Sequence, residues 1–306
     1  MHLKILSTTL FGLSLLLSIQ PGFSADSSSE NEKDTENQNE PKRLVLVAGG
    51  PSHDTGMHEH RAGVLLFERC LTNVENLEVD AHFGGWPSDD GAFDQADAVV
   101  MYMDGGGRHS AVQGDRLELM QSYIDKGMGF GALHYGVEVP ADNGGEQFSE
   151  WIGGHYETNY SANPIWEANY DNLPNHPTFR GVEPFSASDE WYFSIRFRKD
   201  MTGIAPLLIA TPSDETRDGP YVHPQGPYDH IVDAKGESEV MSWAVDRKDG
   251  GRGFGFTGGH YHKNWGNDDY RKYVLNSMVW LTGLDVPANG VTCEVSEADL
   301  EENLDH

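Results

Sequence analysis

The stretch RLVLVAGG at residues 43–50 decides the fold, because an unbroken run of apolar side chains ends there at two glycines. A short run without polar alternation is typical of a strand that is buried on both faces. Such strands occur in parallel sheets whose two sides are covered by helices. We therefore predict that residues 43–48 form the first strand of an α/β domain.

Segments further along the chain repeat this alternation of strand and helix. Val64, Phe67 and Leu71, for example, recur at helical spacing after the first strand. The expected elements are a helix at residues 60–70, a strand at 98–103, a helix at 117–124, a strand at 128–133, strands at 240–245 and 253–257, and a closing helix at 270–281. Their order predicts a parallel sheet with crossover helices.

Residues 140–235 differ from the rest of this pattern. They are rich in Pro, Gly, Asn and aromatic residues and show little periodicity. Segments of this length inside a compact domain usually carry functional loops. We expect a long, loop-rich aromatic insert of loops and short strands in the sheet domain.

Both ends of the chain are expected to lie outside the domain at residues 43–292. Lys4, an apolar run at 5–19 and small residues at 24–25 have the layout of a secretory signal peptide, assigned to residues 1–25. The alternative, a retained membrane anchor, is disfavoured because a span needs about 20 apolar residues. The protein is therefore expected in the periplasm or outside the cell. Residues 26–42 are expected to be a disordered acidic linker, and 293–306 an acidic C-terminal tail.

The charge excludes one class of partner. The sequence has 21 Lys and Arg against 49 Asp and Glu, a formal net charge of −28. Phosphate groups need cations opposite them, so we expect no nucleic-acid partner. Hydrophobic residues make up 38% of the chain, enough for a real core.

Cys70 and Cys293 are the two cysteines of the sequence. Export would permit a disulfide that ties the C-terminal tail to the first helix. Two free, buried thiols are the alternative, and the sequence leaves the choice open. Neither cysteine has the neighbours of a thiol nucleophile.

Histidines and acids gather after the predicted strands. His58, Asp104, His134 and His260 each follow a different strand. Ligands of open parallel sheets bind outside the carboxyl ends of the strands, so we expect these side chains to share one edge. Scattered surface histidines are the alternative, which we prefer for His82, His176 and His230, and which stays open for His53 and His262.

Imidazoles together with carboxylates can bind a divalent metal ion or transfer protons near neutral pH. We predict that His134 is a central base or ligand, and that His58 and His260 are ligands or acid/base partners. The spacing of His58 and His60 matches no closed structural zinc site, so zinc or a similar ion fits these residues without being required.

The segment GFGFTG at residues 253–258 formally matches a dinucleotide-binding pattern. That pattern needs a strand before it and a helix that opens at it. Alternating Phe residues instead place these glycines inside a strand, and we expect no nucleotide cofactor.

The aromatic insert carries Glu190, Trp191, Tyr192 and Arg196 close together. Aromatic faces beside charged groups suit a polyhydroxylated substrate. Ordinary packing with a surface ion pair is the alternative, and spacing alone favours that alternative.

Several blocks, in order, resemble the ThuA-like, or trehalose-utilization, family in the form found among secreted proteins of planctomycete-type bacteria. The resemblance covers about residues 42–291 and is carried by PSH at 51–53, HE at 58–59, DGG at 104–106, LHY at 133–135, WIGG at 151–154, HP at 176–177, DEWY at 189–192, TR at 216–217, GRGFG at 251–255 and HYHKNW at 260–265.

The resemblance implies a flavodoxin-like, class I glutamine-amidotransferase-like sheet. In amidotransferases a cysteine follows the strand that here ends at Leu133, and this chain has His134 in its place. Amidotransferase chemistry needs the thiolate, so that activity is excluded. In its biological context the family is similar to enzymes that process 3-keto-sugars and disaccharides. The resemblance implies that Asp104 and Glu190 contact sugar hydroxyls. The substrate-binding residues that it implies are Trp191, Tyr192, Arg196, Arg217, Trp265 and His262.

The leading hypothesis is a secreted carbohydrate-active enzyme that acts on a glycoside or 3-keto-sugar by lyase, hydrolase or isomerase chemistry. A ketone at C3 acidifies the C2 proton, so a histidine base with a metal ion could expel the anomeric substituent. A noncatalytic sugar-binding protein that uses the same residues is the alternative, and an interaction scaffold is the third.

Overall fold

The computed structural model describes residues 40–305. The expected signal peptide and residues 26–39 of the expected linker lie outside the described residues. Lys42, which we assigned to the linker, is the first residue of a strand.

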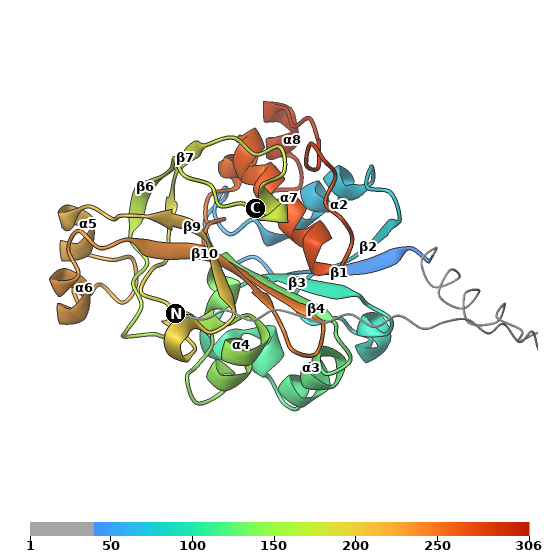
Figure 1. The fold of residues 1–306 in the computed structure, drawn as a ribbon, viewed down its shortest axis with the longest axis horizontal. Helices are drawn as coiled ribbons and strands as arrows, with labels where there is room; N and C mark the ends of the chain where they lie inside the picture. The colour runs from blue at the N-terminus through green and yellow to red at the C-terminus, as the bar shows by residue number, and fades with distance from the viewer. Residues whose placement is uncertain (1–39, 306) are drawn as a thin grey trace, which may run out of the picture. The chain divides into compact units, whose positions relative to one another are not determined.

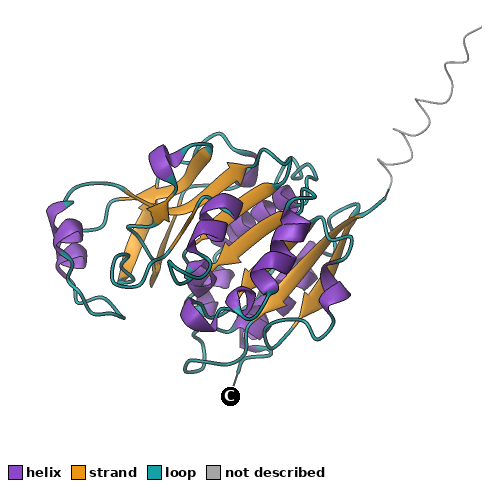
Figure 2. Ribbon diagram, turned by 90° about the horizontal axis from the view of Figure 1, so that it is seen from below, coloured by secondary structure: helices purple, strands orange, loops and turns teal. Residues whose placement is uncertain are grey.

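A mixed sheet of seven strands forms the centre of the domain (Figure 2). Its order is β2 (Leu77–His82), β1 (Lys42–Ala48), β3 (Ala98–Tyr102), β4 (Gly129–Leu133), β11 (Arg252–Phe256), β10 (Glu239–Asp246) and β9 (Ile204–Ala210). The first five strands run parallel, whereas β10 pairs antiparallel with both β11 and β9. The prediction of an α/β sheet is confirmed, and the expectation that all its strands are parallel is wrong. The tight turn between β10 and β11 forces the antiparallel pairing, because a parallel pair needs a longer crossover.

Helices cover both faces of this sheet (Figure 1). One face carries α2 (His60–Leu71) and α7 (Asp268–Leu281), and the other carries α3 (Arg116–Ile124) and α4 (Gly145–Trp151). Alternate residues of β1 supply the two cores: Leu44 and Leu46 pack with the helices of the first face, and Val45 and Val47 with those of the second. This two-sided burial explains why residues 43–48 are apolar without alternation.

Residues 140–235 contain strands as well as loops. Strands β6 (Ile165–Tyr170) and β7 (Phe185–Glu190) form an antiparallel hairpin, and β9 extends the main sheet. Residues of β6 alternate between exposed and buried, as one-sided strands do. The other elements are β5 (Gly154–His155), β8 (Arg196–Phe197), α5 (Asp214–Asp218) and α6 (Asp229–Asp233), with 3-10 turns at Asp90–Phe93, Gly106–Arg108, Ser110–Val112, His134–Val137, Pro177–Phe179, Lys199–Met201 and His262–Gly266.

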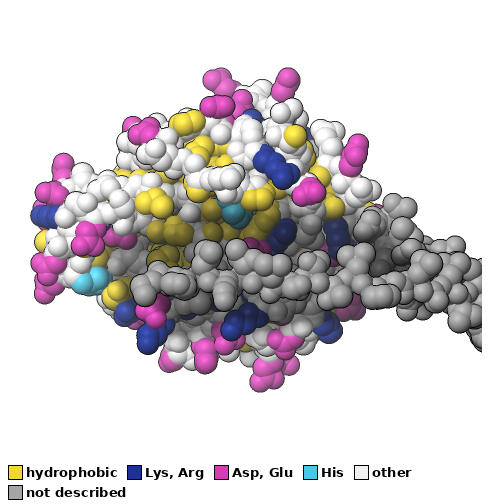
Figure 3. Space-filling model, viewed as in Figure 1, with side chains coloured by type: hydrophobic (Ala, Val, Ile, Leu, Met, Phe, Trp, Pro, Cys, Tyr) yellow, Lys and Arg dark blue, Asp and Glu magenta, His cyan; other side chains and the backbone are white. Residues whose placement is uncertain are grey.

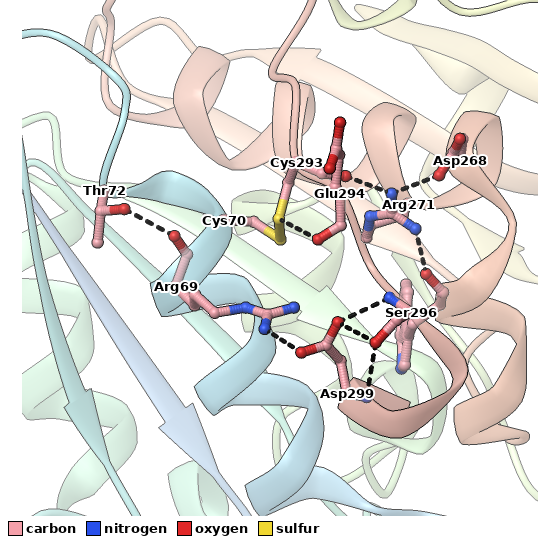
Figure 4. Close-up of a disulfide and its surroundings, with 10 residues drawn as sticks. Arg69, Cys70, Thr72, Asp268, Arg271, Cys293, Glu294, Ser296 and Asp299 are labelled. Carbon is pink, nitrogen blue, oxygen red and sulfur yellow. Dashed lines mark hydrogen bonds and ion pairs between the residues drawn. A yellow bond between two sulfur atoms is a disulfide. The ribbon is translucent and has the colours of Figure 1, made fainter. Parts of the chain in front are cut away.

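Cys70 and Cys293 are joined in a disulfide, which decides the alternative that the sequence left open (Figure 4). Residues beyond Cys293 do not leave the domain. They form α8 (Glu297–Glu301), whose Asp299 pairs with Arg69 of α2. The backbone N–H of Asp305 donates to the buried carboxylate of Glu59 at 2.6 Å. The expected acidic tail is therefore packed against α2 through residue 305.

Within residues 40–305, no helix combines the length and the hydropathy that crossing a bilayer requires.

Candidate functional site

The loops after four neighbouring strands meet at one edge of the sheet. His58 follows β1, Asp104 follows β3, His134 follows β4 and His260 follows β11. Strands β2 and β3 lie on opposite sides of β1, and ligands of such sheets bind at this change of direction. Glu190, the last residue of β7, reaches the same place from the insert.

Three imidazoles and one carboxylate form a buried group that we call the histidine cluster: His58, His134, His260 and Glu190. Their ligand atoms all lie within 4.8 Å of one another. His58 Nε2 is 3.0 Å from both His134 Nε2 and His260 Nδ1. Glu190 Oε2 is 2.7 Å from His260 Nδ1 and 3.5 Å from His134 Nε2.

Backbone conformation aims two of these rings. His58 and His134 both have a φ of 52°, in the left-handed region that residues other than glycine rarely adopt. His134 directly follows β4 and is the first residue of the 3-10 turn His134–Val137. Strained backbone of this kind persists where the surrounding structure requires it, and it concentrates at functional sites.

Hydrogen bonds on the far side of these two rings fix their tautomers. His58 Nδ1 is 2.9 Å from Asp104 Oδ1, and His134 Nδ1 is 2.9 Å from the carbonyl oxygen of Thr257. Both oxygens are acceptors, so each Nδ1 carries the hydrogen and donates it. In the neutral rings, Nε2 then holds a lone pair that points into the cluster. Two lone pairs 3.0 Å apart repel unless a proton or a metal ion lies between them.

The charges of the cluster favour a cation. Burial opposes ionisation of Glu190, but its bonds to His134 and His260 hold the pKa of this carboxyl down to about 2. Burial lowers the pKa of His58 to about 3, despite the bond from its ring to Asp104. Burial also opposes a charge on His134, but the adjoining Glu190 carboxylate raises its pKa. At neutral pH the cluster thus offers an anionic carboxylate and a neutral imidazole to one shared cation.

Asp104 lies outside the cluster and holds the ring of His58 by a hydrogen bond. Burial disfavours its charge, but the bond from His58 holds the pKa of the Asp104 carboxyl down to about 2. Ser52 Oγ donates to the same oxygen at 3.0 Å. A carboxylate that receives the second ring N–H of a histidine is the usual support of a metal-binding imidazole.

Asp189 is a residue of the site that the sequence analysis missed. Its buried carboxylate accepts the backbone N–H groups of Gly259 at 2.8 Å and His260 at 3.1 Å, and the hydroxyl of Tyr270 at 2.7 Å. It therefore holds the loop that carries His260. The signal was the alternation of β7, in which Asp189 falls in phase with the buried residues Phe185 and Ala187.

A cavity of about 490 Å³ is lined by His53 and Asp104, both of which contact His58. Ser52, His53, Asp104 and Arg108 line part of its wall. The exposed ring of His53 stacks on that of His58 with centroids 3.6 Å apart. The volume lies in the range of small-molecule sites, about 300–1,000 Å³.

The predicted substrate-binding residues fall into two groups. Tyr192 belongs to the site, because its hydroxyl is 3.3 Å from His134 Nε2. Trp191 and Trp265 are 0% exposed, so neither ring has a face left for a sugar. Trp191 packs on Phe256 instead.

The remaining three also have other roles. Arg217 is buried and pairs with Glu239 at 2.9 Å. Arg196 pairs with Glu157 at 2.7 Å. His262 is buried on the wall of a separate cavity, beside α8. The structure therefore gives these three residues partners outside the histidine cluster, and their contact with the substrate stays a prediction.

A divalent metal ion fits the residues present. Neutral imidazole nitrogen and carboxylate oxygen are the donors that zinc and related ions accept. His58 and His134 already have the outer hydrogen bonds that such ligands receive in metal sites. The second group with metal-ligand spacing, His53, His58 and Asp104, shares His58 with the cluster and is more exposed.

Comparison with known proteins adds the family. The sequence model of the ThuA family, described as trehalose utilisation, matches residues 45–281. A ThuA-like protein from Bacteroides uniformis superposes with a TM-score of 0.57 at 13% identity, over 86% of this chain and 97% of that one. A ThuA-like protein from Parabacteroides merdae gives a TM-score of 0.52 at 16% identity, over 84% of this chain and 94% of that one.

At these identities the two structures share the fold alone with this protein. No curated protein matches the sequence. The family match, by contrast, spans the sheet from β1 to the end of α7. The chain therefore belongs to the ThuA family.

Proposed function

We propose that the protein is a metal-dependent enzyme that acts on a glycoside or 3-keto-sugar. The observation that carries the proposal is the histidine cluster, in which Nε2 of His58 and Nε2 of His134 lie 3.0 Å apart beside the Glu190 carboxylate. Imidazole nitrogens and a carboxylate oxygen gathered in this way are suitable donors to one divalent ion. His58, His134, His260 and Glu190 would hold the ion.

The chemistry follows from the groups around that position. A bound divalent ion would polarise a carbonyl oxygen of the substrate. Asp104 and Ser52, on the cavity wall, are placed to bind sugar hydroxyls. His53 is the exposed histidine on that wall and supplies the base that a C2 proton requires. His134 is then a ligand rather than the base.

The alternative of noncatalytic sugar binding has less support. It depended on aromatic platforms at Trp191, Tyr192 and Trp265, and all three side chains are buried. Sugar binding without catalysis also gives no reason for a buried cluster of three imidazoles and a carboxylate.

We also propose that the enzyme acts in the periplasm or outside the cell. The signal-peptide pattern of residues 1–25 supports this location. A disulfide between Cys70 and Cys293 is in keeping with it, since such bonds persist in oxidising compartments.

Metal content and turnover test the function together. Protein purified without chelator is expected to carry about one equivalent of a divalent ion by elemental analysis, and anomalous scattering should place it in the cluster. It should also release the anomeric substituent of a 3-keto-glucoside. His134→Ala and Glu190→Gln should lose both metal and turnover, whereas the matched control His82→Ala, on the edge strand β2, should keep both.

Two results would overturn the proposal. One is a metal-free wild-type protein whose turnover is unaffected by chelator. The other is His134→Ala protein that turns the 3-keto-glucoside over at the normal rate.

A further inference from the structure

Glu138 is a buried carboxylic acid next to the histidine cluster that the proposed metal site does not use. It follows the 3-10 turn that begins at His134, and its backbone N–H donates to Tyr135 at 2.9 Å. Its carbonyl oxygen accepts the N–H of Gly106 at 2.9 Å. Backbone contacts on both sides thus fix the position of Glu138 between the loops after β3 and β4.

Polar groups of several elements surround its side chain. Thr158 Oγ1 donates to Glu138 Oε1 at 2.5 Å. A Cβ built on Gly106 would lie 3.5 Å from both Glu138 Oε1 and the Tyr135 hydroxyl. Since Gly106 has no Cβ, the carboxyl and the hydroxyl border the same unfilled space.

Two further hydroxyls near Glu138 lack a protein partner. Those of Tyr156 and Tyr228 are buried, and neither has a hydrogen-bond partner among residues 40–305. Tyr156 is 1% exposed, so leaving its hydroxyl unsatisfied would cost about 1–3 kcal/mol. Burial raises the pKa values of both phenols, and the charge of Glu138 adds to this, which places both within electrostatic range of that carboxyl. Buried, unpaired hydroxyls beside an acid point to a polar ligand that bonds to them.

Aromatic contacts connect this group to the histidine cluster. The ring of Tyr156 lies 5.1 Å from that of Tyr192, centroid to centroid. The hydroxyl of Tyr192 is 3.3 Å from His134 Nε2. The Tyr192 side chain thus connects Tyr156 with the histidine cluster.

The environment keeps Glu138 protonated in a large share of molecules at neutral pH. Burial raises the pKa of its carboxyl to about 7, the nearby Glu190 charge adds to this, and the Thr158 hydroxyl partly opposes it. Lys and Arg side chains do not contribute to this shift. The titratable groups that face Glu138 are Glu190, Tyr135, Tyr156, Tyr192 and Tyr228.

We propose that Glu138 is the proton donor to the leaving group, and that the hydroxyls of Tyr156 and Tyr228 bind the sugar portion next to it. This inference rests on the proposed function. In the elimination, the base takes the C2 proton, the C1–O bond to the leaving group breaks, and a C1–C2 double bond forms. The proton of the Glu138 carboxyl moves to the departing oxygen, so the products are the unsaturated keto-sugar and a neutral alcohol.

Two substrates with different leaving groups test this role. Methyl 3-keto-glucoside must release an alkoxide that needs a proton, whereas 4-nitrophenyl 3-keto-glucoside releases a stable anion. Glu138→Gln preserves shape and should lower kcat/KM for the methyl substrate by about 100-fold or more, with little effect on the nitrophenyl substrate. Wild-type kcat/KM for the methyl substrate should fall as the pH rises through about 7. Glu146→Gln, the same change on the exposed side of α4, should leave both rates unchanged.

The outcomes separate the inference from the function on which it rests. Wild-type protein that cleaves neither substrate contradicts the proposed function. Wild-type protein that cleaves both, with Glu138→Gln affecting both equally or neither, retains the function and overturns the role of Glu138. Tyr156→Phe should raise KM for both substrates, and an unchanged KM would overturn the binding role of that hydroxyl.

Discussion

His58 and His134 show how single residues set the geometry of the site. Each adopts a left-handed backbone conformation, and each is held on its far side by an oxygen acceptor. The conformation directs the ring inward, and the acceptor decides which nitrogen carries the hydrogen. Neither feature adds a ligand, but together they bring the Nε2 atoms of the two rings to within 3.0 Å of each other.

Removing the outer carboxylate should weaken the metal site without removing a ligand. Asp104→Ala leaves the Nδ1–H of His58 without its acceptor, so the ring loses its fixed tautomer and orientation. Affinity for Zn²⁺ in competition with a chromophoric chelator is expected to fall about 10- to 100-fold. The control Asp142→Ala changes an exposed aspartate. Equal affinity in both variants would show that Asp104 does not support the ligand.

Asp189 should matter more for stability than any exposed aspartate. Asp189→Asn turns an acceptor of several hydrogen bonds into a group that places its own N–H donors against Gly259, His260 or Tyr270. The free energy of unfolding in urea is expected to fall by about 2–3 kcal/mol, since bonds to charged groups contribute about 1.5–3 kcal/mol. Asp171→Asn, at an exposed site, is the control. A loss of the same size in the control would contradict this assignment.

At the scale of elements, β11 shows why a strand can need glycines. This strand lies between β4 and β10 and carries GFGF, in which the two Phe rings fill the core of the α7 face. A Cβ at Gly253 would lie 2.2 Å from the carbonyl oxygen of Trp151, and one at Gly255 would lie 2.2 Å from the indole of Trp243. The close approach of Trp151 and Trp243 therefore explains why these positions are glycine.

Gly255→Ala is accordingly expected to overpack the sheet. The methyl group cannot fit without moving the buried Trp243, so the free energy of unfolding should fall by about 1–3 kcal/mol. Gly107→Ala has open space around the new methyl and should change stability by less than about 0.5 kcal/mol. Urea unfolding of the two variants measures the difference, and a fully stable Gly255→Ala protein would refute the packing argument.

At the scale of the whole molecule, the C-terminal segment is bonded to the N-terminal half of the described chain. The disulfide links residues 223 positions apart, and Arg271 donates to the carbonyl oxygen of Cys293 at 2.6 Å (Figure 4). Asp and Glu side chains are spread over the face shown in Figure 3 rather than gathered in one patch. A distributed acidic surface of this kind serves solubility, and the ordered C-terminal segment adds its own acids to it.

Removing the disulfide should destabilise the whole domain. Replacing Cys70 and Cys293 together by Ala lengthens the accessible unfolded chain, and the free energy of unfolding should fall by about 2–5 kcal/mol. Thermal or urea unfolding with and without reductant provides the measurement. Reductant should lower the stability of the wild type toward that of the variant and leave the variant unchanged. A reductant-insensitive wild type of equal stability would argue against the bond.

The sequence alone determined the parts of the fold that depend on local pattern. Buried strands near residues 43–48, 98–103 and 128–133 and the helix from residue 60 were predictable, because two-sided burial demands continuous apolar runs. The strand β2 was missed, since it lies at the sheet edge and its residues are mostly half-buried. The strand β9 was missed for another reason: its apolar run lies in a segment that otherwise shows no periodicity.

The site was predictable to the level of its loops. Because carboxyl ends of parallel strands share an edge, the sequence placed His58, His134 and His260 together, with Asp104 nearby. Only the tertiary structure decided which atoms face one another, that Trp191 and Trp265 turn into the core, and that Glu138 lies near phenols without a hydrogen-bond partner among residues 40–305. The sequence pattern shows which residues are apolar or polar. The orientation and protonation of a side chain depend on neighbours that folding brings into contact from distant parts of the chain.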